Sequence, residues 1–159
     1  MIDLRPVRLD EKTLLFHLFQ AYLREIARFY GEEPDSQGLF PTPYFDAYFQ
    51  EPARHALFMV ENSAVVGFIL VNPYSFLGQR PDHVIAEFCV LPDYRKRKIA
   101  ERAARLLLER FPGRWEIKYH VRNRPAAGLW TKVTAPFSPS VHPLDEEERV
   151  LVFDTRCPG

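Results

Sequence analysis

Cysteine is scarce in this 159-residue chain, which contains only Cys89 and Cys157. Their spacing is not that of a metal site, and two such thiols do not make a disulfide framework. No apolar run comes near the length of about 18 residues that a membrane span needs. The N-terminal stretch MIDLRPVRLDE has no signal-peptide core. We therefore expect a cytoplasmic protein with no membrane partner.

Neither sign of charge is in excess, because Lys plus Arg and Asp plus Glu number 21 each. Nucleic-acid-binding domains usually carry a basic excess, so no nucleic-acid partner is expected. The chain has no G-x-x-x-x-G-K-[ST] loop, no Gly-x-Gly and no G-x-S-x-G, which argues against a P-loop, a dinucleotide fingerprint and a serine-hydrolase elbow. The five histidines show no H-x-H or H-E-x-x-H spacing, and no metal is expected.

What the chain does contain is an alternation of strand and helix patterns, at a length that suits one domain. Periodicity and Gly or Pro breaks predict strands at 2–9, 56–61, 65–71, 84–91, 115–121 and 149–154, and helices at 10–30, 44–49, 99–111 and 123–132. Segments 32–43, 72–82 and 136–148 are predicted as loops. Pro6 favours an edge position for the first strand. This order predicts a mixed α/β domain with helices on both faces of the sheet.

Two of the predicted strands have distinctive patterns. The run VIAEFCVL at 84–91 is apolar except for Glu87, as expected for a central strand covered on both faces. In 115–121, Trp115 and Ile117 alternate with polar residues such as His120. This alternation predicts one buried face and one solvent-facing face, with His120 on the latter.

A basic run, LPDYRKRKIAER at 91–102, lies where a helix is predicted to begin. Cations at a helix N-terminus are disfavoured by about 0.3–1 kcal/mol each. The first amides of a helix have no internal partners and form an anion site. The run therefore predicts a bound phosphate or pyrophosphate. The alternative is a solvated charge run offset by Glu101 and nearby acids.

The stretch EFCVLPDYRKRKIAERAARLLLERFP, followed by NRPAAGLWTKV, resembles the core of the GNAT superfamily of N-acetyltransferases. The family has a strand ending in V-x-P-x-x-R, then [QR]-x-x-G-x-[GA], and later N-x-x-A-x-x-F-Y-x-K. The residues that match are Arg95, Ile99, Ala100, Asn123, Ala126, Leu129 and Lys132. There are two departures: Lys98 stands at the motif glycine, and Trp130 stands at the motif tyrosine, the usual candidate acid.

The resemblance implies a single-domain α/β fold over 1–154, a mixed sheet of about six to seven strands with helices on both faces, and a short tail at 155–159. It implies acetyl-CoA as the acyl donor. The residues that the resemblance places at this cofactor are Arg95, Lys96, Arg97, Lys98, Ile99 and Ala100 for the pyrophosphate, Phe88, Cys89 and Val90 for the pantetheine arm, and Asn123.

Glu87 is the candidate general base. An amine with a pKa of roughly 10 must lose a proton to attack, and burial raises the pKa of a carboxyl group. A structural carboxylate bonded to a neighbouring strand is the alternative. Cys89 is a candidate acyl carrier, although a buried thiol is more often inert packing.

The resemblance places the acceptor in a cleft bordered by the first two helices and their loop, residues 30–44, with the late loop 138–149 also near. Glu32, Glu33 and Asp35 are candidates to attract a cationic amine, and a solvated loop is the alternative. The aromatic residues Phe19, Tyr22 and Tyr30 at helical spacing are interpreted as core.

These observations predict an N-acetyltransferase that moves an acetyl group from acetyl-CoA to a primary amine by direct attack in a ternary complex. The acceptor is a small molecule or a peptide amine. A non-catalytic acyl-CoA-binding module is the alternative that Lys98 and Trp130 motivate, and a nucleic-acid-binding domain using the RKRK run is a third. The family includes monomers and dimers, so a homodimer is an open alternative.

Overall fold

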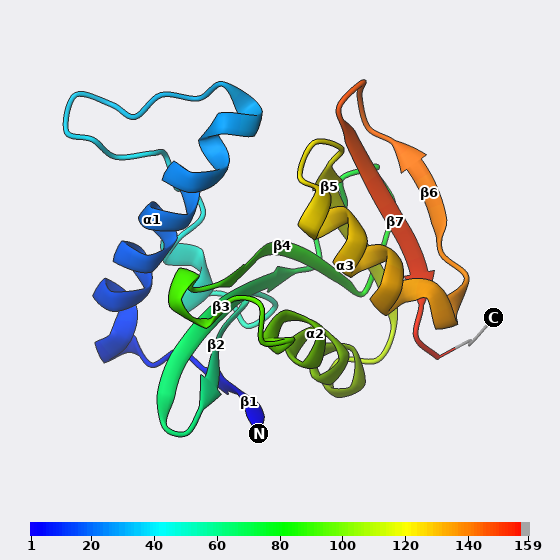
Figure 1. Ribbon diagram of the computed structural model, residues 1–159, viewed down its shortest axis with the longest axis horizontal. Helices are drawn as coiled ribbons and strands as arrows, with labels where there is room; N and C mark the ends of the chain where they lie inside the picture. The colour runs from blue at the N-terminus through cyan, green and yellow to red at the C-terminus, as the bar shows by residue number, and fades with distance from the viewer. Residues whose placement is uncertain (157–159) are drawn as a thin grey trace.

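The computed structural model describes residues 1–156. Its sheet has seven strands in the order β1-β2-β3-β4-β5-β7-β6 (Figure 1). In chain order these are β1 (Ile2–Pro6), β2 (His55–Glu61), β3 (Ala64–Asn72), β4 (His83–Val90), β5 (Arg114–His120), β6 (Ser140–Pro143) and β7 (Glu148–Asp154). The helices are α1 (Lys12–Tyr30), α2 (Ile99–Arg110) and α3 (Arg124–Thr134), with short 3-10 turns η1 (Leu9–Glu11), η2 (Asp46–Phe49), η3 (Pro92–Tyr94) and η4 (Ala135–Phe137).

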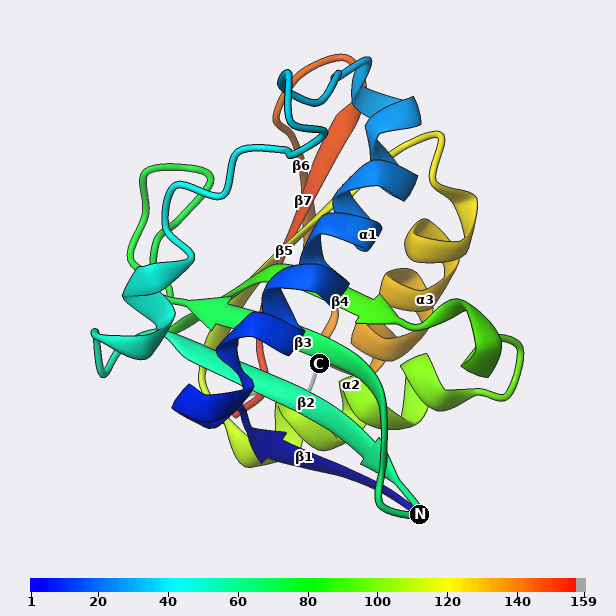
Figure 2. The same ribbon diagram turned by 90° about the vertical axis from the view of Figure 1, so that its left-hand side faces the viewer.

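Helices cover both faces of this sheet, as predicted. Leu15 and Phe19 of α1 pack on Phe58 and Phe68 on one face. The buried residues of α2 and α3, among them Ala103, Leu107 and Trp130, pack with Ile69, Val71 and Ile117 on the other. Figure 2 shows α1 lying across β2, β3 and β4 with α2 and α3 behind the sheet. The fold class predicted from the sequence is confirmed.

The central strands β4 and β5 run parallel but stay paired for a short distance only. Their register joins His83 to Trp115, Val84 to Glu116 and Ile85 to Ile117, and no pair follows among residues 1–156. The two strands therefore separate after Ile85. This split leaves one edge of β4 without a neighbouring strand over Ala86–Val90.

A bulge lies at the start of the split. Leu70 of β3 pairs with Glu87, but the next residue, Val71, pairs with Ile85. Ala86 is therefore the extra residue of β4, and the alternation of side chains shifts by one across it. As a result Ala86 packs on the α1 side and Glu87 shares that side with its partner Leu70.

Two predictions about the C-terminal half are wrong. The predicted loop 136–148 contains η4 and the edge strand β6. The predicted solvent face of β5 is covered, since Glu116 and His120 are buried. The loop 73–82 covers Glu116, whose carboxylate accepts hydrogen bonds from the Ser75 hydroxyl and, at 2.8 Å, from the Phe76 amide. Tertiary partners thus satisfy polar groups that the alternation assigned to water.

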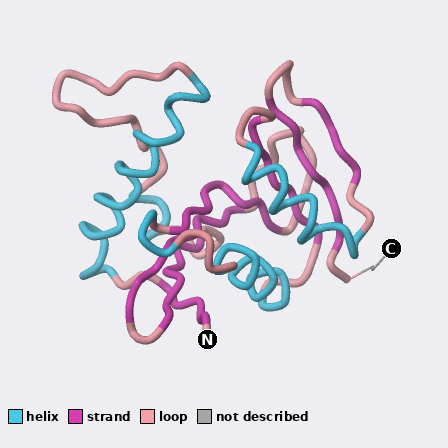
Figure 3. Tube along the Cα trace, viewed as in Figure 1, coloured by secondary structure: helices cyan, strands magenta, loops and turns pink. Residues whose placement is uncertain are grey.

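The other boundaries agree within a few residues. β1 lies at the sheet edge, as Pro6 predicted. Figure 3 shows the long loop that leaves α1 after Gly31. The tail predicted at 155–159 is described only as far as Arg156, and Cys157 lies outside the described residues. Of the helices within 1–156, none has the length and apolar character needed to cross a membrane.

Candidate active site

Glu87 lies between two cavities. The larger cavity, of about 540 Å³, is on the α1 side and is bordered by α1, η2, the loop 41–45 and the strands β3 and β4. The smaller cavity, of about 100 Å³, lies at the split between β4 and β5 and reaches Asn123 and Trp130 of the α3 region. Tyr22, Glu87 and Lys118 line both. A carboxylate at such a junction can act on groups that approach from either side.

The carboxyl group of Glu87 is poorly solvated. Its Oε2 is buried and has no hydrogen-bond partner among the described residues. Burial raises the pKa of Glu87 to about 8, the positive charge of Lys118 lowers this pKa and Glu32 raises it. A carboxyl group with a pKa near neutrality exchanges protons readily under physiological conditions, as a general base must.

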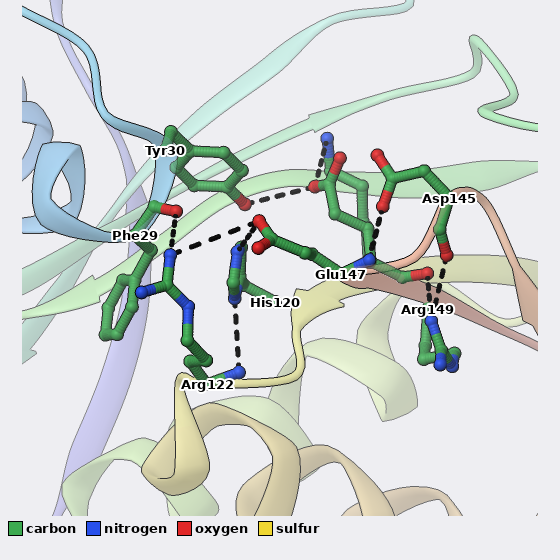
Figure 4. Close-up of polar contacts among 9 residues, drawn as sticks. Phe29, Tyr30, His120, Arg122, Asp145, Glu147 and Arg149 are labelled. Carbon is green, nitrogen blue, oxygen red and sulfur yellow. Dashed lines mark hydrogen bonds and ion pairs between the residues drawn. The ribbon is translucent and has the colours of Figure 1, made fainter.

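Lys118 does not form an ion pair with Glu87. Its Nζ lies 3.1 Å from Glu148 Oε2, and the Tyr30 hydroxyl donates to the same oxygen at 3.1 Å (Figure 4). Burial, and then the charge of Glu148, raise the pKa of Tyr30. The β7 carboxylate therefore pairs with Lys118, and the Glu87 carboxyl group has no ion-pair partner among the described residues.

The turn between β4 and α2 has an unusual backbone. Lys96 has a φ of 64° and Lys98 a φ of 60°, both in the left-handed region. Successive backbone amides in a turn of this kind can point into one concavity that suits an anion. The amides of Lys96, Arg97 and Lys98 make no hydrogen bond within residues 1–156. The turn that the sequence predicts as an anion site thus leaves three amides free within the described residues, and the free amides of the first turn of α2 adjoin them.

The four cations of this turn have different surroundings. The Arg95 guanidinium is turned back, donating from Nε to Val90 O at 2.9 Å and from both Nη atoms to Glu25. The Arg95 amide also has a partner, Pro92 O at 3.4 Å. Arg97 lies over the Tyr94 ring. Lys96 and Lys98 are exposed and have no ion-pair partner among the described residues, so these two remain available to an anion.

The open edge of β4 presents main-chain groups to the split. Leu91 N donates to Val66 O on the β3 side at 2.8 Å. Alternate residues of an antiparallel strand direct their N–H and C=O to the same side, so those of Phe88 and Val90 point away from β3, toward the split. Cys89 directs its main chain to β3 and its buried thiol to the α1 side. Burial raises the pKa of Cys89 to about 12, which argues against an acyl-carrying thiolate.

A family model described as the acetyltransferase (GNAT) family matches residues 19–134, which span these features. The chain belongs to this family. The GNAT family is one of acyltransferases, and its model includes the turn, the split and Glu87. No curated protein matches the chain.

Solved structures agree on the fold. An acetyltransferase from Thermus thermophilus is 17% identical, with a TM-score of 0.69 and coverage of 97% of both chains. Spermidine N-acetyltransferase from Vibrio cholerae, in complex with CoA and spermine, is 11% identical with a TM-score of 0.70, over 98% of this chain and 96% of that one. Arabidopsis thaliana NAA60, in complex with acetyl-CoA, is 14% identical with a TM-score of 0.64, over 97% and 99%. The prediction of acetyl-CoA as acyl donor agrees with these complexes.

The structure describes the two residues that depart from the GNAT motifs, Lys98 and Trp130. Lys98 adopts the left-handed conformation that the motif glycine adopts without strain, at a cost of about 1–2 kcal/mol. Trp130 is buried, and its ring meets the Phe88 ring edge-on at 4.8 Å. The indole has no titratable hydroxyl. Asn123 caps α3, with Oδ1 accepting from Ala126 N at 3.3 Å, and lines the smaller cavity of this GNAT domain.

The surface position predicted for His120 is wrong, because this side chain is 2% exposed. Figure 4 shows it beside Arg122 and Glu147. Its Nδ1 accepts from the Arg122 amide at 3.1 Å, so Nε2 carries the proton and donates to Glu147 Oε2 at 2.9 Å. The Phe29 ring stacks on it at 5.5 Å. Since both nitrogens have partners, His120 joins α1, β5 and the β6–β7 turn and is not a free base.

From the sequence, several residues that line the larger cavity were interpreted in another role or were not identified. Tyr22 and Tyr30, interpreted as core, line it. Of the three loop acids, Glu32 lines the cavity, whereas Asp35 accepts hydrogen bonds from the amides of Gln37 and Leu39 and so shapes its own loop. Arg54 also lines the cavity, and no local pattern in the sequence marked it.

Proposed function

We propose that the protein is an N-acetyltransferase that moves an acetyl group from acetyl-CoA to a primary amine, by direct attack within a ternary complex. The observation that carries the proposal is the position of Glu87, with its unpartnered oxygen, between a cavity suited to an acceptor and the split beside the anion-binding turn. The GNAT match supports the reaction class.

The residues present fit acetyl-CoA. The left-handed turn offers the amides of Lys96, Arg97 and Lys98, followed by those of Ile99 and Ala100, to a pyrophosphate. Lys96 and Lys98 add free positive charge. The edge of β4 would hold the pantetheine arm and its thioester through the main-chain groups of Phe88 and the amide of Val90, as an added strand does. The Val90 carbonyl already accepts from Arg95 Nε. Cys89 contributes only its place in the strand. The bound donor supplies an activated thioester.

Two groups of this chain then act on the acceptor and the carbonyl. Glu87, when deprotonated, accepts a proton from the acceptor ammonium, directly or through a water. The outward amide of Val90 donates to the carbonyl oxygen on which negative charge develops. Holding amine and thioester together in one site supplies a further part of the acceleration.

A proton donor for the departing thiolate has to come from elsewhere than Trp130. Tyr22 lines both cavities, and burial together with the charge of Glu87 raises its pKa well above the ordinary value. The raised pKa keeps the hydroxyl protonated at neutral pH but makes it a weaker acid, so the assignment rests on its position in both cavities. We assign Tyr22 this part of the proposed reaction.

A thermal-shift titration followed by an amine panel tests the proposal. Acetyl-CoA and CoA should raise the melting temperature, and dephospho-CoA should raise it less if Lys96 or Lys98 meets the 3′-phosphate. Release of free thiol from acetyl-CoA should then depend on an added primary amine. Absence of stabilisation by any of these nucleotides would contradict the proposal at its first step.

A non-catalytic acyl-CoA-binding module is the second candidate, and the absence of a hydroxyl at Trp130 favours it. Stabilisation by acetyl-CoA without thiol release across a broad amine panel would support this candidate over the transferase. A nucleic-acid-binding role for the basic run predicts affinity that falls steeply with salt. The turned-back Arg95 weakens that reading.

A further inference from the structure

The larger cavity contains a charged side chain, that of Arg54, two strands away from Glu87. The side chain of Arg54, just before β2, is 9% exposed and lines this cavity. Its guanidinium carbon lies 5.0 Å from the ring centre of Tyr44, 5.3 Å from that of Tyr48 and 4.6 Å from that of Tyr74. Three aromatic rings thus hold the guanidinium in place by packing and cation–π attraction.

The protein uses only part of the hydrogen-bonding capacity of Arg54. A guanidinium has five N–H donors. Nε donates to Glu51 Oε1 at 3.2 Å through a single hydrogen bond, and the Tyr48 hydroxyl is the other side-chain partner. Glu51 is 45% exposed, and it also accepts from the Tyr74 hydroxyl. The remaining donors are not among the buried unpartnered atoms of the described residues, so they are accessible from outside the protein. A largely covered guanidinium with accessible donors can receive a carboxylate or similar planar anion.

Arg54 and Glu87 lie on the same face of the sheet. Leu70 pairs with both Ala56 and Glu87, which places these three residues in one row across β2, β3 and β4. Arg54 precedes Ala56 by two residues and so faces the same way. Two strand spacings of about 4.8 Å and two residues of about 3.3 Å put the Cα atoms of Arg54 and Glu87 about 12 Å apart. The two side chains shorten that gap to the length of a small acceptor.

We propose that Arg54 binds the anionic end of the acceptor, so that the substrate is a primary amine with a carboxylate several bonds away, such as an ω-amino acid or a short peptide. This inference rests on the proposed function, because it takes Glu87 as the end where the amine reacts. Glu32 at the same cavity favours the ammonium end. The two charges of such an acceptor would each meet an opposite charge.

The test compares matched acceptors on the wild-type protein. 4-Aminobutanoate, 4-aminobutanamide and 1,4-diaminobutane have the same carbon chain and differ only in the group at the far end. Longer homologues of the three compounds vary the distance between the amine and that group. We expect kcat/KM for the carboxylate to exceed that for its amide by about tenfold or more at the best chain length, as charged hydrogen bonds require. Equal values at every length, or a preference for the diamine, would overturn the inference.

Variants separate recognition from packing. Arg54→Gln should remove the carboxylate preference, because it should lower kcat/KM for the carboxylate far more than for the amide. Arg54→Lys should keep a reduced preference because it retains charge but not the fork. Glu51→Gln should increase the preference, since it removes the negative charge that competes with the acceptor carboxylate for the guanidinium. If Arg54 serves only to hold the tyrosines, Arg54→Gln will lower kcat/KM equally for the carboxylate and the amide, and the inference fails.

Failure of the Arg54 subsite can be distinguished from failure of the proposed transferase function. If no amine is acetylated, the proposed function fails, and the subsite is judged by calorimetric binding of 4-aminobutanoate and its longer homologues. Binding that Arg54→Gln abolishes and Glu51→Gln strengthens would support the subsite. Absence of binding, or binding that Arg54→Gln leaves intact, would overturn it.

Discussion

Arg95 binds Glu25 through both Nη atoms, at 2.8 Å each, across 70 positions of sequence. The same guanidinium donates from Nε to Val90 O. One side chain therefore joins the turn between β4 and α2, the end of β4 and helix α1. Because α1 borders the larger cavity and the turn borders the split, this contact fixes the two halves of the site relative to each other.

Loss of this contact should destabilise the protein in steps. Glu25→Gln removes only the ion pair, whose side chains are 39% and 38% exposed. An exposed pair of this kind is worth about 1 kcal/mol at most. Arg95→Gln also frees the Val90 carbonyl and should cost more in urea unfolding. The KM for acetyl-CoA should rise with Arg95→Gln. Equal unfolding free energies for the two variants would show that the Val90 contact contributes nothing.

Glu87 should control the pH dependence of the rate. Its pKa of about 8 means that the base form grows as pH rises through that value, so kcat/KM should rise from pH 6 to pH 9. Glu87→Gln should lower kcat by about 100-fold and remove this limb of the profile. If kcat/KM of Glu87→Gln still rises with pH in the same way, another group is responsible for the rise.

The same carboxyl group should make stability depend on pH in the opposite sense. Its pKa is 4.5 ordinarily and about 8 in the folded protein, so between these values the folded state holds a proton that the unfolded chain has released. Its contribution to stability is present below pH 4.5 and is lost as pH rises through 8. Urea unfolding from pH 5 to 9 should therefore show a steeper decline for the wild type than for Glu87→Gln. Parallel curves would contradict burial of this group.

Substitutions of Lys98 should change both the stability of the protein, through the backbone strain, and acetyl-CoA binding, through the charge. Lys98→Ala keeps a side chain at a φ of 60°, whereas Lys98→Gly relieves the strain. Both variants lose the charge, so they should weaken acetyl-CoA binding alike in calorimetry. Lys98→Gly should be more stable than Lys98→Ala by up to about 1 kcal/mol, because relief of about 1–2 kcal/mol of left-handed strain is partly offset by the greater freedom of glycine in the unfolded chain. Tighter acetyl-CoA binding by Lys98→Gly would show that the lysine obstructs the phosphates.

Tyr22→Phe tests the proton donor. The ring packs on Phe19 and Phe68, so the variant keeps the packing and loses the hydroxyl. We expect kcat to fall by about tenfold or more with KM for both substrates nearly unchanged. The loss should be smaller with a thioester whose thiolate is a better leaving group. An undiminished kcat would mean that no acid is needed at this position.

The sequence predicted the parts of the site that depend on neighbours along the chain. The turn after Pro92 is predicted as an anion site from residues within one stretch, and anion binding there stays a prediction. The structure adds the left-handed backbone of Lys96 and Lys98. The continuous apolar run of β4, with Glu87 as its single charge, was also sufficient to place a carboxylate in a covered strand. What failed was the face of β5, because the groups that cover Glu116 and His120 come from distant segments.

The sequence by itself determined the order of strands and helices, the basic turn and the buried carboxylate, because periodicity and turn chemistry act over a few residues. The tertiary structure alone decided the bulge at Ala86, the separation of β4 from β5, the partner of Arg95 and the place of Arg54 in the cavity. These depend on contacts between strands and helices far apart in the chain, and such contacts form only when the sheet twists, its strands set their register and the helices pack on its two faces.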